Sequence, residues 1–189
     1  MSVSEIIKES FSQYAGAVLQ SRAFVDVRDC LKPSTRQILY CMYKNNRTHD
    51  KPAPKTATVV GDSLIYYIHG DASAEGIIMR AGQPFNMRYP LIEVKGNGGS
   101  MIASGNWAAT RYTSCRLSEI SSWFFKDINK DSIEEWRENH DGTDYYPSVV
   151  PSKGFYNIVN GSFGIGIGLS CSIPQFNIKE VNKDRKSVV

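Results

Sequence analysis

Apolar side chains recur at the i, i+3, i+4 spacing of an amphipathic helix in several stretches of the chain. The helices predicted from this spacing cover residues 4–19, 34–43, 56–68, 74–81 and 117–128. Ser4 is suited to cap the first of them, and Pro33 is suited to the first turn of the second. Asp71 or Ser73 is expected to cap the fourth, after a glycine-containing turn. The third and fourth helices, joined by this tight turn, form a helix-turn-helix candidate.

The remaining pattern favours short strands and turns. Residues 90–94 are a predicted strand, 96–99 a turn and 136–147 a loop. After residue 150, short apolar runs alternate with glycines, which indicates a second region that contains β-strands. A helix-turn-helix followed by a strand and turns is typical of a winged helix. We therefore predict the α+β fold class, with a winged-helix domain ahead of a β-containing region.

Composition narrows the class of protein. Hydrophobic residues make up 41% and charged residues 22% of the chain, as in ordinary globular domains. Runs of ~18 apolar residues are absent from the sequence and its start lacks the pattern of a secretory signal, so no membrane association and a cytoplasmic location are expected. The four cysteines form no C-x-x-C pair and lack zinc spacing with the three histidines. Neither a metal site nor a disulfide framework is predicted.

Charge is distributed unevenly along the chain. The formal net charge is only +3. Residues 22–112, however, carry twelve Lys/Arg against seven Asp/Glu, whereas residues 113–146 carry four against eight. The basic stretch could face a polyanion, and the acidic stretch is more typical of a solvated surface. This asymmetry is weak support by itself, because many protein surfaces vary as much.

Tyr112 is a candidate nucleophile. A phenol can attack a phosphodiester, and the adjacent Arg111 supplies a cation to oppose the charge that develops on the phosphate. Most tyrosines are core or surface residues, and this chain has ten, so chemistry alone leaves the structural role more common. The glycine-rich segment 164–168 lacks the third glycine of a dinucleotide loop and any Gly-Lys-Ser/Thr, which favours tight strand packing over a nucleotide site.

Motifs along nearly the whole chain resemble one family of DNA enzymes. Their order and spacing, from about residue 4 to 181, are similar to those of the A subunit of bacterial DNA gyrase and topoisomerase IV. The motifs that carry the resemblance are Asp26-Val27-Arg28-Asp29, Leu31-Lys32-Pro33, Val59-Val60-Gly61-Asp62, His69-Gly70-Asp71, Ala108-Ala109-Thr110-Arg111-Tyr112-Thr113, Asp141-Gly142-Thr143 and Val159-Asn160-Gly161-Ser162. The resemblance implies a type IIA topoisomerase breakage–reunion subunit, with a winged-helix DNA-gate domain and the start of a β-containing tower domain.

The resemblance also implies residue roles. Tyr112 would become linked to a 5′ phosphate by transesterification, with Arg111 assisting at the scissile phosphate and Arg22 near the active site of the assembly. Four further residues match positions at the DNA: Lys32, Arg36, His69 and Ile165. The three cationic ones would contact phosphates or the active site. Ile165 would wedge between base pairs of the gate DNA. Departures occur at Thr35, Gln37 and Tyr67, where the family carries basic side chains.

The implied assembly extends beyond this chain. It would be an A2B2 complex on double-stranded DNA: a homodimer of A subunits with a B-type subunit that holds Mg²⁺ and binds ATP. The domains expected are a partner-docking helix at 1–21, the winged-helix breakage–reunion domain at 22–148, and the tower start at 149–183. Residues 184–189 resemble a translated sequencing adapter, so we expect a non-native tail on a truncated gene product. The isolated fragment is then expected to bind DNA without cleaving it efficiently.

Two other functions stay open. A non-catalytic winged-helix DNA-binding protein could keep this fold and lose the reaction. A tyrosine recombinase would also use a tyrosine, but its arginine and histidine motifs are not evident in this sequence. The sequence does not separate supercoiling from decatenation.

Overall fold

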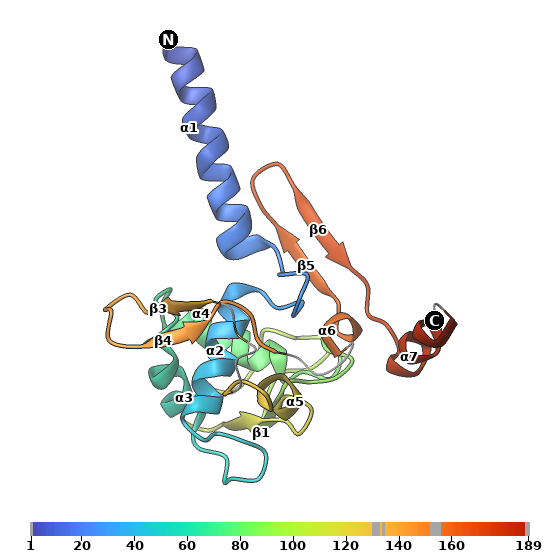
Figure 1. Ribbon diagram of the computed structural model, residues 1–189. Coiled ribbons are helices and arrows are strands. Elements are labelled where there is room, and N and C mark those ends of the chain that lie inside the picture. Colours follow the sequence, from blue (N-terminus) through green and yellow to red (C-terminus); the bar gives the residue numbers. More distant parts are fainter. Residues whose placement is uncertain (1, 130–132, 134, 152–155, 188–189) are drawn as a thin grey trace.

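The structure, a computed structural model, describes residues 2–129, 133, 135–151 and 156–187. Helix α1 (Val3–Val18) extends away from the body of the molecule, and the hairpin of β5 (Ser162–Ile165) and β6 (Ser170–Ile173) extends from the same side (Figure 1). The elements from α2 to β4 form the body. The result is a mixed α+β fold, as the sequence pattern predicts.

Helix α1 begins with a capping box at Ser2. The Ser2 hydroxyl accepts a hydrogen bond from the Glu5 amide at 3.3 Å, and the Glu5 carboxylate accepts one from the Ser2 amide at 2.6 Å. The predicted cap at Ser4 is therefore wrong, because Ser4 already lies in the first turn. Helix α1 has no buried residue, and the π-helical turn η1 (Leu19–Ala23) that follows begins the contact with the body.

Helix α2 (Pro33–Lys44) matches the prediction closely. Pro33 occupies the first turn, where its missing amide hydrogen costs nothing. Ile38, Leu39 and Met42 lie on the buried face, each at most 1% exposed. This helix therefore runs through the centre of the core.

Helix α3 (Thr56–Ser63) is shorter than the predicted 56–68. The chain turns after Ser63, whose carbonyl accepts hydrogen bonds from the amides of Tyr66 and Tyr67 at 3.1 and 2.9 Å. Both tyrosines are buried at this turn. The helical spacing of the apolar residues continues through the turn, so hydrophobic periodicity alone does not locate the end of the helix.

Helix α4 (Asp71–Ala81) follows, capped by Gly70 rather than by a side chain. Gly70 has φ of +91°, in the left-handed region that favours glycine. The expected cap by Asp71 or Ser73 is wrong, since both lie inside the helix. Asp71 instead places its charge in the first turn, where it complements the helix dipole.

The sheets of the described residues are two-stranded antiparallel pairs. Strand β1 (Ile92–Lys95) pairs with β2 (Ser114–Leu117), and Ile92 lies opposite Leu117. The predicted helix 117–128 is therefore largely wrong: Leu117 ends a strand, and only α5 (Ser122–Phe125) is helical there. The predicted loop at 136–147 is also wrong, because β3 (Trp136–Glu138) and β4 (Tyr145–Pro147) form a hairpin.

The β5–β6 hairpin packs closely against η1 at two of its glycines. A side chain at Gly164 would collide with the Ala23 carbonyl, and one at Gly166 would collide with the Leu19 side chain. Glycine is thus required for close approach, as the strand-packing interpretation of segment 164–168 predicts. A short helix α6 (Tyr156–Val159) precedes the hairpin, and α7 (Ile178–Ser187) follows it.

One hydrophobic core holds the body together. Its largest fully buried side chains come from α2, α3, α4, α5, the strands β1 and β2, the residue before β1 and the segment after β4: Ile38, Leu39, Met42, Val59, Ile78, Leu91, Ile92, Leu117, Phe124, Phe125 and Val150. Within the described parts of the chain, none of the helices has both the length and the apolar character needed to cross a lipid bilayer. The domain boundaries at 22, 149 and 184 stay predictions, and residues 188–189 of the expected tail lie outside the described residues.

Asp144 fastens the β3–β4 hairpin to the helices. Its carboxylate accepts hydrogen bonds from the Lys44 ammonium and from the Tyr66 hydroxyl, each at 2.5 Å. These two donors, Lys44 first, hold the pKa of Asp144 below its ordinary value. The Tyr66 ring also packs edge-on against Tyr40 and Tyr146, with ring centroids 5.4 and 6.0 Å apart. The hairpin is therefore fixed relative to α2 and the turn after α3.

Replacing Tyr66 by phenylalanine is expected to make the free energy of unfolding fall less steeply at alkaline pH. Burial and then the hydrogen bond to Asp144 raise the pKa of Tyr66, so the folded state favours the neutral phenol. Such a contribution is complete below the unfolded pKa of about 10 and is lost as pH rises above it. We expect Tyr66→Phe to unfold more easily at pH ~8, by about 1–2 kcal/mol. Between pH ~9 and ~12 it should then lose less stability than the unmodified chain. Urea unfolding at these pH values measures both effects, and an equal alkaline loss would contradict this role of Tyr66.

Candidate functional site

Tyr112 lies in a turn that is anchored beneath the start of α3. The amides of Thr56 and Ala57 donate to the carbonyls of Thr113 and Thr110, at 3.1 and 3.3 Å. The hydroxyl of Thr113 also donates to that of Thr56 at 2.9 Å, and both threonines are fully buried. The Tyr112 side chain is 66% exposed. Buried contacts next to it thus fix the backbone while the phenol faces solvent.

Arg111 lies directly beside the Tyr112 ring. The guanidinium carbon is 4.7 Å from the ring centroid, which is within the range of a cation–π contact. Both side chains are exposed. The pair therefore presents a phenolic oxygen and a positive charge together on the surface, an arrangement suited to attack on a phosphodiester.

Arg22 lies in η1 and lines two cavities of the described structure. The first, which we call the hairpin cavity, has a volume of about 580 Å³ and is also lined by His69 and the β3–β4 hairpin. The second, the Lys32 cavity, has a volume of about 710 Å³ and is also lined by Lys32. Arg22 thus links His69 on one side to Lys32 on the other.

The Lys32 cavity is lined by cations and by neutral groups. Arg22, Lys32 and Arg80 contribute positive charge, and the described residues that line this cavity include no aspartate or glutamate. The Lys32 ammonium donates to the Phe163 carbonyl at 2.7 Å, which joins the N-cap of α2 to β5. Burial lowers the pKa of Lys32. This electrostatic character fits an anionic ligand.

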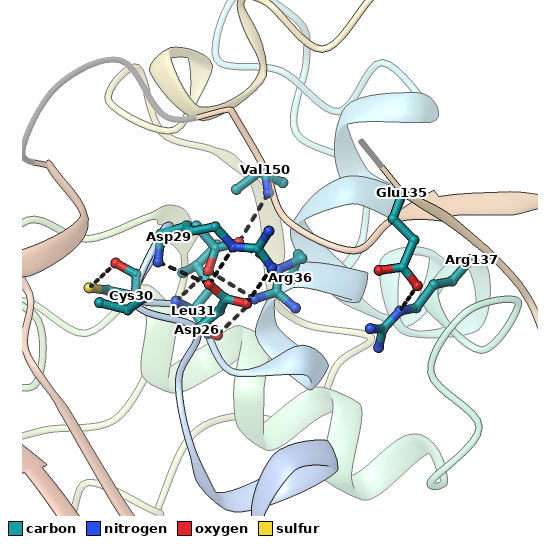
Figure 2. Close-up of polar contacts among 10 residues, drawn as sticks. Asp26, Asp29, Cys30, Leu31, Arg36, Glu135, Arg137 and Val150 are labelled. Atoms are coloured by element: carbon teal, nitrogen blue, oxygen red, sulfur yellow. Dashed lines mark hydrogen bonds and ion pairs between the residues drawn. The ribbon is translucent and has the colours of Figure 1, made fainter. Parts of the chain in front are cut away.

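Arg36 lies in the interior rather than on a DNA-facing surface. Its guanidinium donates to both carboxylate oxygens of Asp29, at 2.6 and 2.8 Å, and to the Leu31 carbonyl at 3.1 Å (Figure 2). Arg36 is 5% exposed and Asp29 is fully buried. Asp29 also accepts from the amides of Leu31 and Val150, both at 3.0 Å. In this conformation Arg36 joins distant segments of the chain and does not offer its charge to a ligand.

The two remaining predicted DNA contacts are exposed. His69 lies in the turn before α4, with its ring 5.1 Å from that of Tyr67. Ile165 ends β5 next to the turn of the β5–β6 hairpin and is 71% exposed. An apolar side chain in this position is free to insert into a ligand.

Arg80 is a candidate residue that the sequence motifs do not single out. It lies in the last turn of α4, lines the Lys32 cavity, and has its guanidinium carbon 6.0 Å from the Trp107 ring centroid. Trp107 in turn donates its indole N–H to Glu75 of α4 at 2.8 Å. The available signal is its position in the second helix of the helix-turn-helix candidate.

The predicted site residues therefore do not form a single cluster. Arg22 shares one cavity with His69 and another with Lys32, whereas Arg111 and Tyr112 form their own exposed pair and line neither cavity. No cluster of three or more His, Cys, Asp or Glu side chains suited to a metal ion occurs among the described residues. The four cysteines are free.

Comparison with known proteins assigns the family. Residues 22–189 match the family described as DNA gyrase/topoisomerase IV, A subunit. The chain is 43% identical over 180 residues to the A subunit of DNA gyrase from Staphylococcus epidermidis, covering 95% of this chain and 20% of that protein. It is 43% identical over 182 residues to the A subunit of DNA gyrase from Brachyspira hyodysenteriae, covering 96% and 22%. The chain thus spans about a fifth of the length of the curated relatives it matches. It belongs to the family of DNA gyrase and topoisomerase IV A subunits.

Proposed function

We propose that this chain is the N-terminal part of the breakage–reunion subunit of a type IIA topoisomerase and that Tyr112 cuts DNA. The observation that carries the proposal is the exposed Tyr112 phenol with the Arg111 guanidinium beside it, on a turn anchored by buried threonines. The tyrosine oxygen would attack the phosphorus and form a 5′-phosphotyrosine link. The bond from phosphorus to the 3′ oxygen breaks, and the departing 3′ hydroxyl takes up a proton. One phosphodiester replaces another, so religation needs no external energy.

The DNA-binding parts of the proposal follow the arrangement of the elements. Helices α3 and α4 with their connecting turn would form the helix-turn-helix, and β1–β2 the wing of a winged helix. Arg22, Lys32 and His69 would contact phosphates near this surface. The β5–β6 hairpin would begin a tower domain, with Ile165 as an apolar wedge between base pairs. Arg36 would reach DNA only if it left Asp29, and we assign it the buried ion pair instead.

The proposed assembly is an A2B2 complex on double-stranded DNA, in the cytoplasm. The exposed α1 would dock the B-type subunit, which would hold Mg²⁺ and bind ATP. Because the described residues offer no acidic metal-binding cluster, we assign the metal to that partner. Mg²⁺ would supply electrostatic stabilisation of the reacting phosphate. Tyr112 and Arg111 of this chain would supply the nucleophile and a neighbouring positive charge.

The test is DNA cleavage by a full-length A-type protein that carries this N-terminal sequence, assembled with its B-type subunit. Supercoiled plasmid and Mg²⁺ are added, and the reaction is stopped with detergent and protease. We expect linear DNA from the complete mixture and none when the B-type subunit or Mg²⁺ is left out. A complete mixture that binds plasmid but leaves it uncut would contradict the proposed reaction and favour a non-catalytic winged-helix protein.

A further inference from the structure

Two basic side chains of the β3–β4 hairpin lie in the hairpin cavity with Arg22 and His69. Arg137 belongs to β3, and His140 lies in the turn that follows it. Four arginine and histidine side chains from three parts of the chain thus line one cavity of about 580 Å³. Glu138 is the acidic side chain among its lining residues, and its carboxylate accepts a hydrogen bond from the Tyr145 hydroxyl at 2.8 Å. The cavity is therefore rich in potential donors to an anion.

The hairpin that carries these side chains is held rigidly. Asn139, between Arg137 and His140, is 5% exposed and uses both ends of its amide. Its oxygen accepts from the amides of Thr143 and Asp144, at 2.9 and 3.1 Å. Its nitrogen donates to the Thr143 hydroxyl at 3.0 Å and to the Ile65 carbonyl at 3.3 Å. The bond to Ile65 joins the hairpin turn to the segment before His69, which keeps the facing arginine and histidine side chains in place without a ligand.

The Arg137 guanidinium is only weakly engaged. Its Nε donates to Glu135 at 3.2 Å, and the two side chains are 55% and 59% exposed. Figure 2 shows this pair apart from the buried Asp29–Arg36 pair. Exposed ion pairs contribute little, about 0–1 kcal/mol, whereas an arginine fork binds a phosphate with two parallel hydrogen bonds. A phosphate can therefore displace Glu135 at small cost.

Arg22 connects the hairpin cavity to the Lys32 cavity, since it lines both. A sugar-phosphate backbone that reaches Lys32 and Arg22 can therefore continue toward Arg137. We propose that Arg137 and His140 bind backbone phosphates and extend the DNA-binding surface onto the β3–β4 hairpin. This inference rests on the proposed DNA-binding function. It adds a contact surface outside the helix-turn-helix.

The test measures how salt weakens DNA binding by the 189-residue chain. Fluorescence anisotropy with a short labelled duplex gives the affinity at several salt concentrations. Removal of one phosphate contact should reduce the slope of log affinity against log salt by about 0.9. We expect the double variant Arg137→Gln/His140→Gln to reduce the slope by about 1–2. The single variant Arg137→Lys, in which His140 is unchanged, should have the same slope as the unmodified chain, because the substitution preserves the positive charge. Lys126→Gln, at the end of α5 and outside both cavities, is the matched control and should change nothing.

Each outcome has one meaning, provided that circular dichroism melting shows the variants folded. An unchanged slope in the double variant would overturn the inference and leave the proposed function intact. An unchanged slope together with weaker retention on immobilised polyglutamate would assign the surface to an acidic protein, which also overturns it. An equal reduction of the slope in the Lys126→Gln control would overturn the inference, because it would show that loss of any positive charge has this effect. Failure of the unmodified chain to bind DNA would overturn both the inference and the proposed DNA contacts, whereas binding without cleavage by the assembled enzyme would overturn the reaction alone.

Discussion

Changing Tyr112 to phenylalanine is expected to abolish covalent attachment to DNA, a drop of roughly 10³-fold or more. The substitution removes only the phenolic oxygen. The turn that carries the ring is anchored by Thr56, Ala57, Thr110 and Thr113, so its conformation should be retained. DNA affinity should therefore change little while the cleavage product disappears. Detergent-trapped protein–DNA adduct, formed by the full-length protein with its B-type partner and Mg²⁺, measures the effect.

Tyr43→Phe is the control for this variant. Tyr43 is half-buried on α2 and lines neither of the two cavities. Its replacement also removes one phenolic oxygen and should leave the amount of adduct unchanged. If Tyr43→Phe and Tyr112→Phe reduced the adduct equally, the reduction would not identify Tyr112 as the nucleophile.

Asp29→Ala is expected to lower the free energy of unfolding by about 3–5 kcal/mol. The carboxylate is fully buried and accepts hydrogen bonds from Arg36, from the Leu31 amide and from the Val150 amide (Figure 2). Its removal leaves a guanidinium that is 5% exposed without its counter-charge, together with two unpaired amides. The Val150 bond joins residues 121 positions apart, so the segment after β4 should also loosen. Urea unfolding near neutral pH measures the change.

The neighbouring Asp26–Arg28 pair, which is more accessible to solvent, provides the control for Asp29. Asp26 binds Arg28 at 2.9 Å, with side chains 27% and 56% exposed. Asp26→Ala should cost about 1 kcal/mol or less, because solvent screens the pair. Arg36→Met in the Asp29→Ala background should recover part of the stability by removing the buried charge. Equal effects of Asp29→Ala and Asp26→Ala would contradict the structural role assigned to the buried pair.

The sequence predicts those elements whose signal is local. Helix α2 has an apolar face of the right period and Pro33 at its start, and both features are local. The pattern predicts a loop in place of the β3–β4 hairpin because each strand has only three residues and β3 is fully exposed. The hairpin depends on Asn139 and on Asp144, which bonds Lys44 across 100 positions. Contacts of that separation leave no trace in hydrophobic periodicity.

The candidate site likewise has some features with a local sequence signal and others that depend on long-range contacts. Tyr112 and Arg111 are adjacent in sequence, so a motif is enough to suggest the pair, and the structure adds the 4.7 Å contact. Arg36 shows the limit of a motif: residue type indicates a phosphate contact, but burial beside Asp29 depends on tertiary packing. The two cavities that share Arg22 likewise combine distant segments, and no spacing rule predicts them.

The most direct test of the central claim is to find which residue carries the DNA. The adduct trapped from the full-length protein with its B-type partner is digested with nuclease and protease, and the nucleotide-bearing peptide is identified by mass spectrometry. We expect a 5′-linked nucleotide on the tyrosine of the peptide that contains Arg111 and Tyr112. A nucleotide on any other residue, or an adduct that persists in Tyr112→Phe, would contradict the claim.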